Sequence, residues 1–363
     1  MRSHREPLFH LAKQGDVSGR RAWAIRLASF VLAIFIGGLI FLFLGHNPFR
    51  AYGEIITGSL GRKTALRQTI KIAVPLLGTA LAIAPCFKMR FWNIGAEGQI
   101  TAGAIGATFF ALNYANRLPS PLLLTIMGLS GVLCGALWAL IPAIFKARWG
   151  TNETLFTLMM NYIVIGMVKY LQGGPWEGKP GSQIIPNFNN AAVLPKVLGV
   201  HCGWIMVLIL TLFIFIYMNY SKHGYEISVI GESPKTARYA GMDVGRVTRR
   251  TMMLSGGMCG LVGYMVASGA NMTLYHNVAD GVGFTAITVA WLSQLNPFAM
   301  IAISLLLAIL DKGAGTLQTA MQVPTSISDI ITGIFLFCML ACEFFINYRI
   351  LFSGGRKKEA KEG

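Results

Sequence analysis

The chain is poor in charge. Only 13% of its 363 residues are charged, and Asp and Glu together number 15. A soluble globular protein carries about twice this share of charged residues. Because 54% of the residues are hydrophobic, the apolar surface exceeds what a single soluble core of this length buries. The composition therefore excludes disordered and ordinary soluble classes and indicates a protein whose outer surface contacts lipid.

Motifs for several chemistries are absent. The sequence has no Gly-x-x-x-x-Gly-Lys-Ser/Thr loop, so we expect no ATP site of this type in the chain. It has neither His-Glu-x-x-His nor Gly-x-Ser-x-Gly, which argues against an intramembrane protease or hydrolase. The six cysteines form no Cys-x-x-Cys pair, and we expect neither a metal site nor another cofactor. The sequence predicts a protein without catalytic activity of its own.

Long apolar runs are what the sequence has in abundance. A bilayer core needs about 20 apolar residues per helix, so the runs at 282–294 and 297–310 are too short to cross unaided and predict half-helices or a re-entrant pair. Asp311, Lys312 and Asp329 are interpreted as loop ends. The sequence predicts an all-α polytopic membrane protein with about ten transmembrane helices, some short or broken. The ten runs are 27–44, 69–87, 98–115, 121–145, 153–171, 204–220, 251–269, 282–294, 297–310 and 327–346.

The basic residues predict an orientation. Lys and Arg number 31 and give a formal net charge of +16. Nucleic acid is not an expected partner, because no long soluble segment exists to bind it. With the N-terminus inside, the inner segments carry 21 basic residues and the outer loops 8, which favours cytoplasmic termini. The basic first outer loop does not fit this rule. We expect a basic cytoplasmic tail at 1–26, a transmembrane domain at 27–346 with a cytoplasmic loop at 221–250, and a second basic tail at 347–363.

Polar residues interrupt the second and third apolar runs. Asn93, Glu97 and Gln99 lie there, together with two glycines. A charge at the centre of a membrane costs at least ~2.5 kcal/mol, so we expect Glu97 to face a cavity, a partner or the interface. The alternative is a polar turn at the membrane surface, with Glu97 capping the helix that follows.

A second polar group follows a helical spacing. Glu153, Thr157 and Asn161 occur at i, i+4 and i+8 and form a stripe on an otherwise apolar helix. We expect this stripe to face the protein interior. Alternatively, Asn152 is an N-cap, Glu153 complements the helix dipole, and Asn161 hydrogen-bonds between helices. The residues predicted to line a solute pathway are Asn93, Glu97, Gln99, Glu153, Thr157 and Asn161.

The loop 221–250 contains a candidate docking helix. Ser233 is a good N-cap, Pro234 suits the first helical position, and Gly241 can end the helix. So short a helix is marginal alone and needs a surface to dock against. The alternative is a solvated loop that only supplies positive charge. The candidate docking residues are Glu232, Ser233, Pro234, Lys235, Arg238, Tyr239 and Gly241.

A further polar stretch runs from Asn277 to Phe284 and includes Asp280 and Gly281. Glycines and an acid beside a broken span can line a permeation path. Here the interpretation as a loop without a transport role is favoured.

Three segments together resemble a known family. They are 93–99 (Asn-Ile-Gly-Ala-Glu-Gly-Gln), the pairs Asn152-Glu153 and Asn161-Tyr162, and 231–241, which ends in Ala-Arg-Tyr-Ala-Gly. They are similar to membrane permease subunits of bacterial ATP-binding-cassette (ABC) importers of the simple-sugar and nucleoside branch, which is related to ribose and branched-chain amino acid permeases. The resemblance covers residues 45–345.

The resemblance implies a multi-pass permease of the bacterial plasma (inner) membrane that translocates a small polar solute, a nucleoside or simple sugar. Its implied partners are cytoplasmic ATP-binding subunits, a second permease that is similar but not identical, an extracytoplasmic substrate-binding lipoprotein and the lipid bilayer. The helix within 231–241 would be the coupling helix, seated in a groove of the ATPase.

Two departures from the family pattern concern the solute. The branch commonly has an acid after Gly283-Phe284, where this chain has Thr285. Ser293-Gln294 also replaces a residue that is usually small. The alternative function is an ion-coupled secondary transporter in which Glu97 or Glu153 titrates. Such a transporter would need no docking helix.

Overall fold

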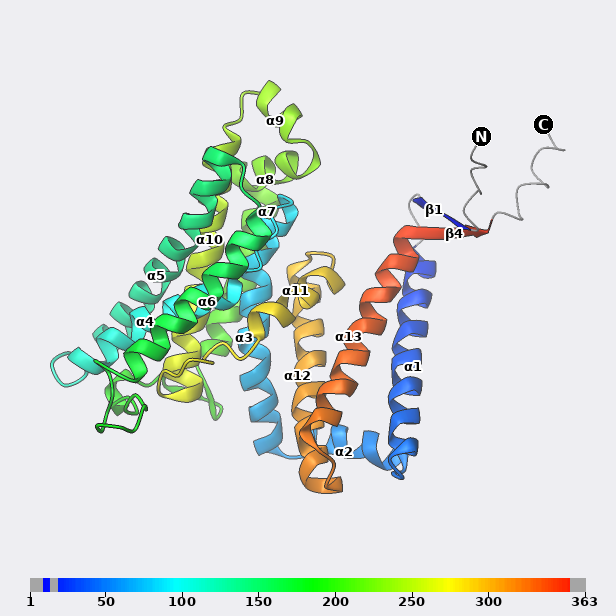
Figure 1. Ribbon diagram of the computed structural model, residues 1–363, viewed down its shortest axis with the longest axis horizontal. Helices are drawn as coiled ribbons and strands as arrows, with labels where there is room; N and C mark the ends of the chain where they lie inside the picture. The colour runs from blue at the N-terminus through cyan, green and yellow to red at the C-terminus, as the bar shows by residue number, and fades with distance from the viewer. Residues whose placement is uncertain (1–8, 14–18, 353–363) are drawn as a thin grey trace, which may run out of the picture. The chain divides into compact units, whose positions relative to one another are not determined.

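The computed structural model describes residues 9–13 and 19–352. They are mostly helical (Figure 1), which confirms the all-α prediction. Two compact units are present, one made of the chain up to Thr57 together with the chain from Gly313 onward, and one made of Gly58–Lys312. The remaining parts of the predicted tails, 1–8, 14–18 and 353–363, lie outside the described residues.

The first unit pairs the two ends of the chain. Strands β1 (Phe9–Lys13) and β4 (Tyr348–Phe352) are antiparallel neighbours, and Phe30 meets Phe335 edge to face at 5.8 Å. Helix α1 begins eight residues before the predicted run, within the predicted basic tail. The helices of this unit are α1 (Gly19–Phe43), most of α2 (Pro48–Leu60), the end of α12 (Pro297–Met321) and α13 (Thr325–Asn347).

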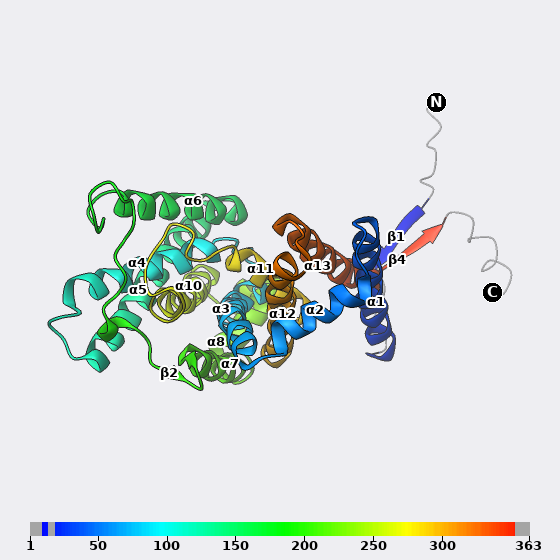
Figure 2. The ribbon, with the colours of Figure 1, turned by 90° about the horizontal axis from the view of Figure 1, so that it is seen from below.

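The second unit holds the functional candidates and is a helical bundle (Figure 2). Residues 173–202 form no span, in keeping with their Gly and Pro content. The elements are α3 (Lys63–Lys88), α4 (Ala96–Tyr114), α5 (Ser120–Trp149), α6 (Glu153–Gln172), η1 (Asn190–Ala192), β2 (Lys196–Val197), β3 (Val200–His201), α7 (Gly203–Tyr220), α8 (Lys222–Glu232), α9 (Pro234–Tyr239), α10 (Val244–Met265), η2 (Val266–Asn271), α11 (Val282–Leu292) and the start of α12.

Glycines bring α10 against α4 and α5 at the centre of this unit. A Cβ atom on Gly260 would lie 2.1 Å from the carbonyl oxygen of Gly131, and one on Gly103 would lie 2.3 Å from the Cα atom of Gly260. A Cβ atom on Gly135 would meet the carbonyl oxygen of Gly256 at 2.2 Å. The backbones therefore touch directly, as small residues in membrane helices permit.

Fewer helices pass as membrane spans than the ten predicted. Among the described residues, six are long and apolar enough, or seven if α1 and α2, bent by 114°, count as one. The predicted run 98–115 forms α4, whose mean hydropathy is lowered mainly by Glu97, Gln99 and Asn113. The six are Lys63–Lys88, Ser120–Trp149, Glu153–Gln172, Gly203–Tyr220, Val244–Asn271 and Pro297–Met321.

Two predicted runs have different bounds. The run 297–310 was wrongly taken as too short, because α12 continues through Asp311 and Lys312 and has 25 residues. Asp329 likewise lies within α13 and not at a loop end. Helix α10 begins at Val244, seven residues before the predicted run, and ends in a π-helical segment. Charged residues inside these helices, such as Asp311 and Lys312 in α12 and Arg249 and Arg250 in α10, interrupt the apolar runs and concealed the true length of each helix.

The run at 282–294 forms a short helix, as expected, but not half of a re-entrant pair. Helix α11 has 11 residues and is preceded by non-helical chain at residues 272–281. Figure 1 shows this yellow segment rising from the end of η2 to α11, on the way toward the end of the unit that carries α8 and α9. We call that end the α9 end. Non-helical chain and α11 together make one broken crossing.

Candidate functional site

The loop between α3 and α4 is built around buried amides. The Asn93 side chain donates to Gln99 Oε1 at 3.2 Å and to Ser255 Oγ on α10 at 3.3 Å. Gln99 Nε2 donates in return to Asn93 Oδ1 at 3.1 Å. All three side chains are buried. Mutual bonding removes the cost of placing these polar groups in the bundle and fixes the loop at the start of α4.

Helix α6 holds the same loop from the other side. Asn161 Nδ2 donates to the carbonyl oxygen of Ile94 at 3.0 Å, and Asn161 Oδ1 accepts from the Gly98 amide at 2.9 Å. Thr157 Oγ1 accepts from the Ile94 amide at 3.2 Å. The expectation that Thr157 and Asn161 face the interior is confirmed, and Asn161 bonds between elements as the structural alternative proposed.

Glu97 caps a helix that is remote in sequence. Its Oε1 accepts from the Gly281 amide at 2.9 Å and its Oε2 from the Gly283 amide at 2.8 Å, 184 and 186 residues away. The first-turn amides of α11 thereby receive the acceptor that their own sequence lacks. A Cβ on Gly283 would lie 2.4 Å from the Glu97 nitrogen, so the close approach requires glycine. The alternative interpretation, in which Glu97 caps its own helix α4, is therefore wrong.

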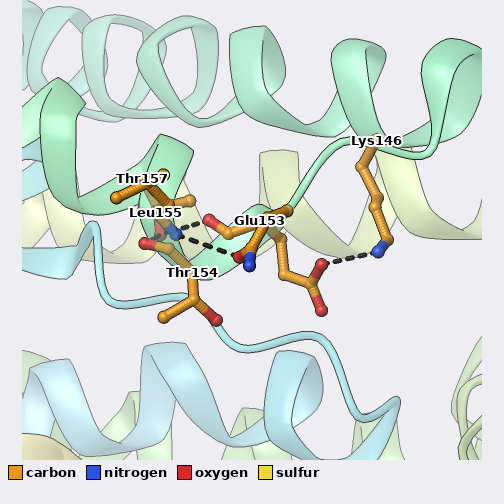
Figure 3. Close-up of polar contacts among 6 residues, drawn as sticks. Lys146, Glu153, Thr154, Leu155 and Thr157 are labelled. Carbon is orange, nitrogen blue, oxygen red and sulfur yellow. Dashed lines mark hydrogen bonds and ion pairs between the residues drawn. The ribbon is translucent and has the colours of Figure 1, made fainter.

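Glu153 does not join this cluster. Its Oε2 forms an ion pair with Lys146 Nζ of α5 at 2.6 Å, and Figure 3 shows the carboxylate pointing toward that lysine. Asn152 accepts from the Leu155 amide at 3.2 Å, which confirms it as the N-cap of α6. We call residues 93–99, the end of the α3–α4 loop and the first turn of α4, the 93–99 loop. The predicted polar stripe is therefore divided, because Thr157 and Asn161 contact the 93–99 loop while the Glu153 carboxylate faces α5.

Three aromatic rings stack beside the loop, a feature that the sequence analysis missed. Trp92 and Trp291 lie 5.6 Å apart with nearly parallel rings, and Phe87 lies 5.8 Å from each. They come from the end of α3, the loop after it and the end of α11. This stack, together with the Glu97 cap, attaches both ends of α11 to the α3–α4 region.

Helix α9 forms where the sequence predicts it. Ser233 Oγ accepts from the Thr236 amide at 3.2 Å, Pro234 is the first helical residue, and Gly241 has a φ of +78° directly after the C-cap. Tyr239 is 92% exposed at the tip, whereas Ala237 is fully buried. Glu232, Lys235 and Arg238 are also exposed. A preformed helix with an exposed outer face is the arrangement that the docking hypothesis requires.

The base of α9 is anchored to α3. Ala237 belongs to a buried cluster with Met89 and Phe91, which follow α3, and with Ile227 and Ile230 of α8. At the end of α8, a Cβ on Gly231 would lie 2.0 Å from the carbonyl oxygen of Lys88. The backbones of α8 and α3 are therefore in direct contact. The α9 end is therefore continuous in packing with the 93–99 loop.

The start of α10 completes this region. Asp243 Oδ1 accepts from the Arg246 amide at 2.9 Å as the N-cap of the helix. This bond, with the nearby charges of Arg246 and Arg249, lowers the pKa of the Asp243 carboxyl below its usual value. A cavity of about 380 Å³ lies between α8 and α10, lined by charged residues that include Lys222, Glu226, Asp243, Arg246 and Arg250.

Comparison with known proteins identifies the family. Residues 66–340 match the family described as branched-chain amino acid transport system, permease component. The chain is 29% identical to a glucose ABC transporter permease protein of Haloferax volcanii, covering 91% of this chain and 90% of the relative. It is 27% identical to a guanosine ABC transporter permease protein of Bacillus subtilis, covering 92% and 96%.

Two further similarities were found. A nucleoside ABC transporter permease protein of Lactococcus lactis is 26% identical, covering 89% of this chain and 92% of the relative. An inward-facing structure of a metal-chelate type ABC transporter aligns with a TM-score of 0.44 at 17% identity, covering 89% of this chain and 99% of that one. The match to the family spans most of the chain, and the apolar helices agree with it. The chain belongs to the permease-component family of ABC transporters and is a multi-pass protein of the plasma (inner) membrane.

Proposed function

We propose that this permease imports a small polar solute, a nucleoside or a simple sugar, driven by cytoplasmic ATP-binding subunits. Relatives of nearly the same length transport glucose, guanosine and nucleosides, according to their names. The family implies ATPase partners and a substrate-binding protein. We further propose that the assembly includes a second, similar permease and that the receptor is an extracytoplasmic lipoprotein. The chain itself supplies translocation and no ATP hydrolysis.

The observation that carries this proposal is the preformed helix α9. Its outer face presents Lys235, Arg238 and Tyr239 to solvent, while Ala237 fixes its inner face to the bundle. Aromatic residues and arginine are enriched at protein interfaces. We propose that this face sits on the ATPase, with Glu232, Ser233, Pro234 and Gly241 giving the helix its position and shape.

A continuous packing route leads from α9 to the middle of the bundle. Movement of α9 displaces Met89 and Phe91 through the Ala237 cluster. Those two residues lead directly into Asn93 and the loop that carries Glu97, and Glu97 holds the start of α11. A rigid chain of contacts can pass a displacement at one end to a broken helix at the other. ATP-driven motion of α9 would thereby move α11.

We propose that the predicted pathway residues serve the solute pathway through this route. Asn93 and Gln99 fix the loop, and Glu97 fixes α11. Thr157 and Asn161 fix the loop to α6, whose first turn Glu153 ties to α5. Their role is to keep the elements that form the path attached to one another while those elements move together.

The experiment is co-purification of the full chain with a co-encoded ATPase subunit. Arg238→Glu with Tyr239→Ala should reduce recovery of the ATPase at least tenfold. Tyr170→Ala is the matched control, because Tyr170 is also exposed but lies near the far end of α6. Unchanged recovery in the double variant would remove the docking proposal. Recovery of no ATPase by the wild-type chain would favour the ion-coupled transporter instead.

A further inference from the structure

The non-helical part of the broken crossing, residues 272–281, joins η2 to α11 within the second unit. At one end, the carbonyl oxygen of Met272 accepts from the Phe188 amide at 2.8 Å, and Thr273 Oγ1 donates to Ile185 at 3.0 Å. At the other end, Gly281 is bonded to Glu97 near the start of α4. The first two contacts are with the loop after α6, and the last is with the first turn of α4. Residues 274–280 therefore lie between these two places as a series of turns and form no helix.

This segment has two chemically different sides. Leu274, Val278 and Ala279 are buried against the bundle. His276, Asn277 and Asp280 are exposed instead. Asn277 Nδ2 donates to Asp280 Oδ1 at 2.7 Å, which orients the carboxylate. The exposed side is thus polar and carries a carboxylate.

Lipid is an unsuitable neighbour for such a surface. Irregular backbone at membrane depth is tolerated where it is buried in protein or borders a water-filled cavity. A carboxylate facing hydrocarbon is costly, and intramembrane charges characteristically face a solvated path. Discontinuous helices mark the solute sites of many transporters. The exposed polar side of residues 276–280 meets both descriptions.

We propose that His276, Asn277 and Asp280 form one wall of the aqueous solute path and that this wall binds the paired hydroxyl groups of the solute. The inference rests on the proposed function, because it assumes a nucleoside or sugar as the solute. The bond from Asn277 uses one oxygen of the Asp280 carboxylate and leaves Oδ2 for another donor. The amide oxygen of Asn277 is a further acceptor beside it. Two neighbouring acceptors suit a vicinal diol, which presents two O–H donors.

The proposed wall is linked through the Glu97 cap to the contacts that lead to α9. Asp280 immediately precedes Gly281, whose amide Glu97 holds. A displacement that reaches α11 through the 93–99 loop would therefore also shift Asp280. This linkage gives a physical reason for the solute to be released when the ATPase changes state, because the diol site and the Glu97 cap are adjacent in the chain.

Thiol accessibility tests for the water path without any assumption about the solute. His276→Cys and Asn277→Cys are made in the full chain, co-expressed with its partners, and treated in open membrane fragments with a charged, membrane-impermeant methanethiosulfonate. The control is Ile209→Cys, whose native side chain is 64% exposed on α7. We expect both test cysteines to react at least tenfold faster than the control. Reaction as slow as that of Ile209→Cys would overturn the proposal and indicate lipid or a partner chain over this surface.

Uptake of radiolabelled guanosine and of glucose tests the diol site. Asp280→Asn should reduce uptake of the transported solute at least tenfold, with normal ATPase recovery, and Asp280→Glu should retain part of it. Normal uptake by Asp280→Asn would contradict diol binding. If the wild-type importer takes up neither solute while the test cysteines react rapidly, the proposed solute class fails and the water path stands. If the wild-type importer takes up either solute but the test cysteines are unreactive, the proposal that residues 276–280 line the water path is wrong. The proposed function is then unaffected.

Discussion

The 93–99 loop and helix α9 lie in one packed region, yet the chain stabilises them in different ways. The loop depends on partners far away in sequence: Ser255, Asn161 and the amides of α11. Helix α9 depends on bonds within its own neighbourhood, from Ser233 to the Thr236 amide and through the turn at Gly241. A region held by distant partners can pass on movement between helices, whereas a locally held region can keep its shape while it moves as a body.

The largest effect on stability is expected at Gly260, where α10 contacts a helix that is distant in sequence. Gly260→Ala would place a Cβ 2.1 Å from the carbonyl oxygen of Gly131, and backbone on both sides cannot yield. We expect a loss of at least about 3 kcal/mol in stability and little folded protein. The control Gly166→Ala has no atom within 4 Å of the new Cβ and should be neutral or slightly stabilising. Thermal unfolding in detergent measures both, and equal melting temperatures would contradict the packing argument.

A second test compares the two carboxylates. Glu97→Gln places a side-chain NH₂ beside two amide donors in a buried site. We therefore expect the free energy of unfolding to fall by about 2–4 kcal/mol. Glu153→Gln weakens a partly exposed ion pair and should cost less than about 1 kcal/mol. The same thermal unfolding assay applies to both variants. A smaller loss for Glu97→Gln than for Glu153→Gln would show that the α11 cap is not important for stability.

A third test uses pH at a buried histidine. His201 packs against Gly203 and Gly269, and its ring nitrogens have no hydrogen-bond partner in the described part of the chain. Burial, with the nearby charge of Lys71, lowers the pKa of His201 to about 4. Between pH 6.5 and pH 4, His201 is protonated in the unfolded chain but stays neutral in the folded chain. The free energy of unfolding therefore falls as the pH drops from 6.5 toward 4.

This loss should amount to about 2 kcal/mol between pH 7 and pH 5. His201→Phe should flatten that part of the profile, measured as the melting temperature in detergent at each pH. His46→Phe is the control, since His46 lies in the loop between α1 and α2 and belongs to the other compact unit. An unchanged profile in His201→Phe would show that the histidine is not the group responsible.

The smallest effect is expected at α9. Ser233→Ala removes one capping bond, worth about 1 kcal/mol to the helix, and should leave the melting temperature of the protein unchanged. Hydrogen exchange at the Thr236 amide should accelerate about fivefold, which that free energy predicts. A fall in global stability comparable with that of Glu97→Gln would show that α9 is not held locally.

This difference also explains what sequence reasoning could reach. Ser233, Pro234 and Gly241 predicted α9 because capping signals act within a few residues. Asn93, Glu97 and Asn161 were recognised as unusual polar residues, but their partners depend on how the helices fold together. Nothing near Glu97 in the sequence points to Gly281, although the Gly-Val-Gly sequence at the start of a short helix signals a close contact. The short run at 282–294 predicted a half-helix, but apolar counting could not show the turns before it, because it ignores irregular chain.

The cap on α11 has a consequence for how the protein is made. A helix of 11 residues, preceded by polar irregular chain, is too short to enter a bilayer as an independent span. Its acceptor, Glu97, belongs to a helix synthesised 184 residues earlier. The crossing can therefore be completed only by docking onto a bundle that has already been inserted. Membrane insertion of this permease is expected to be sequential, with the α3–α4 region acting as the template on which the last part of the second unit folds.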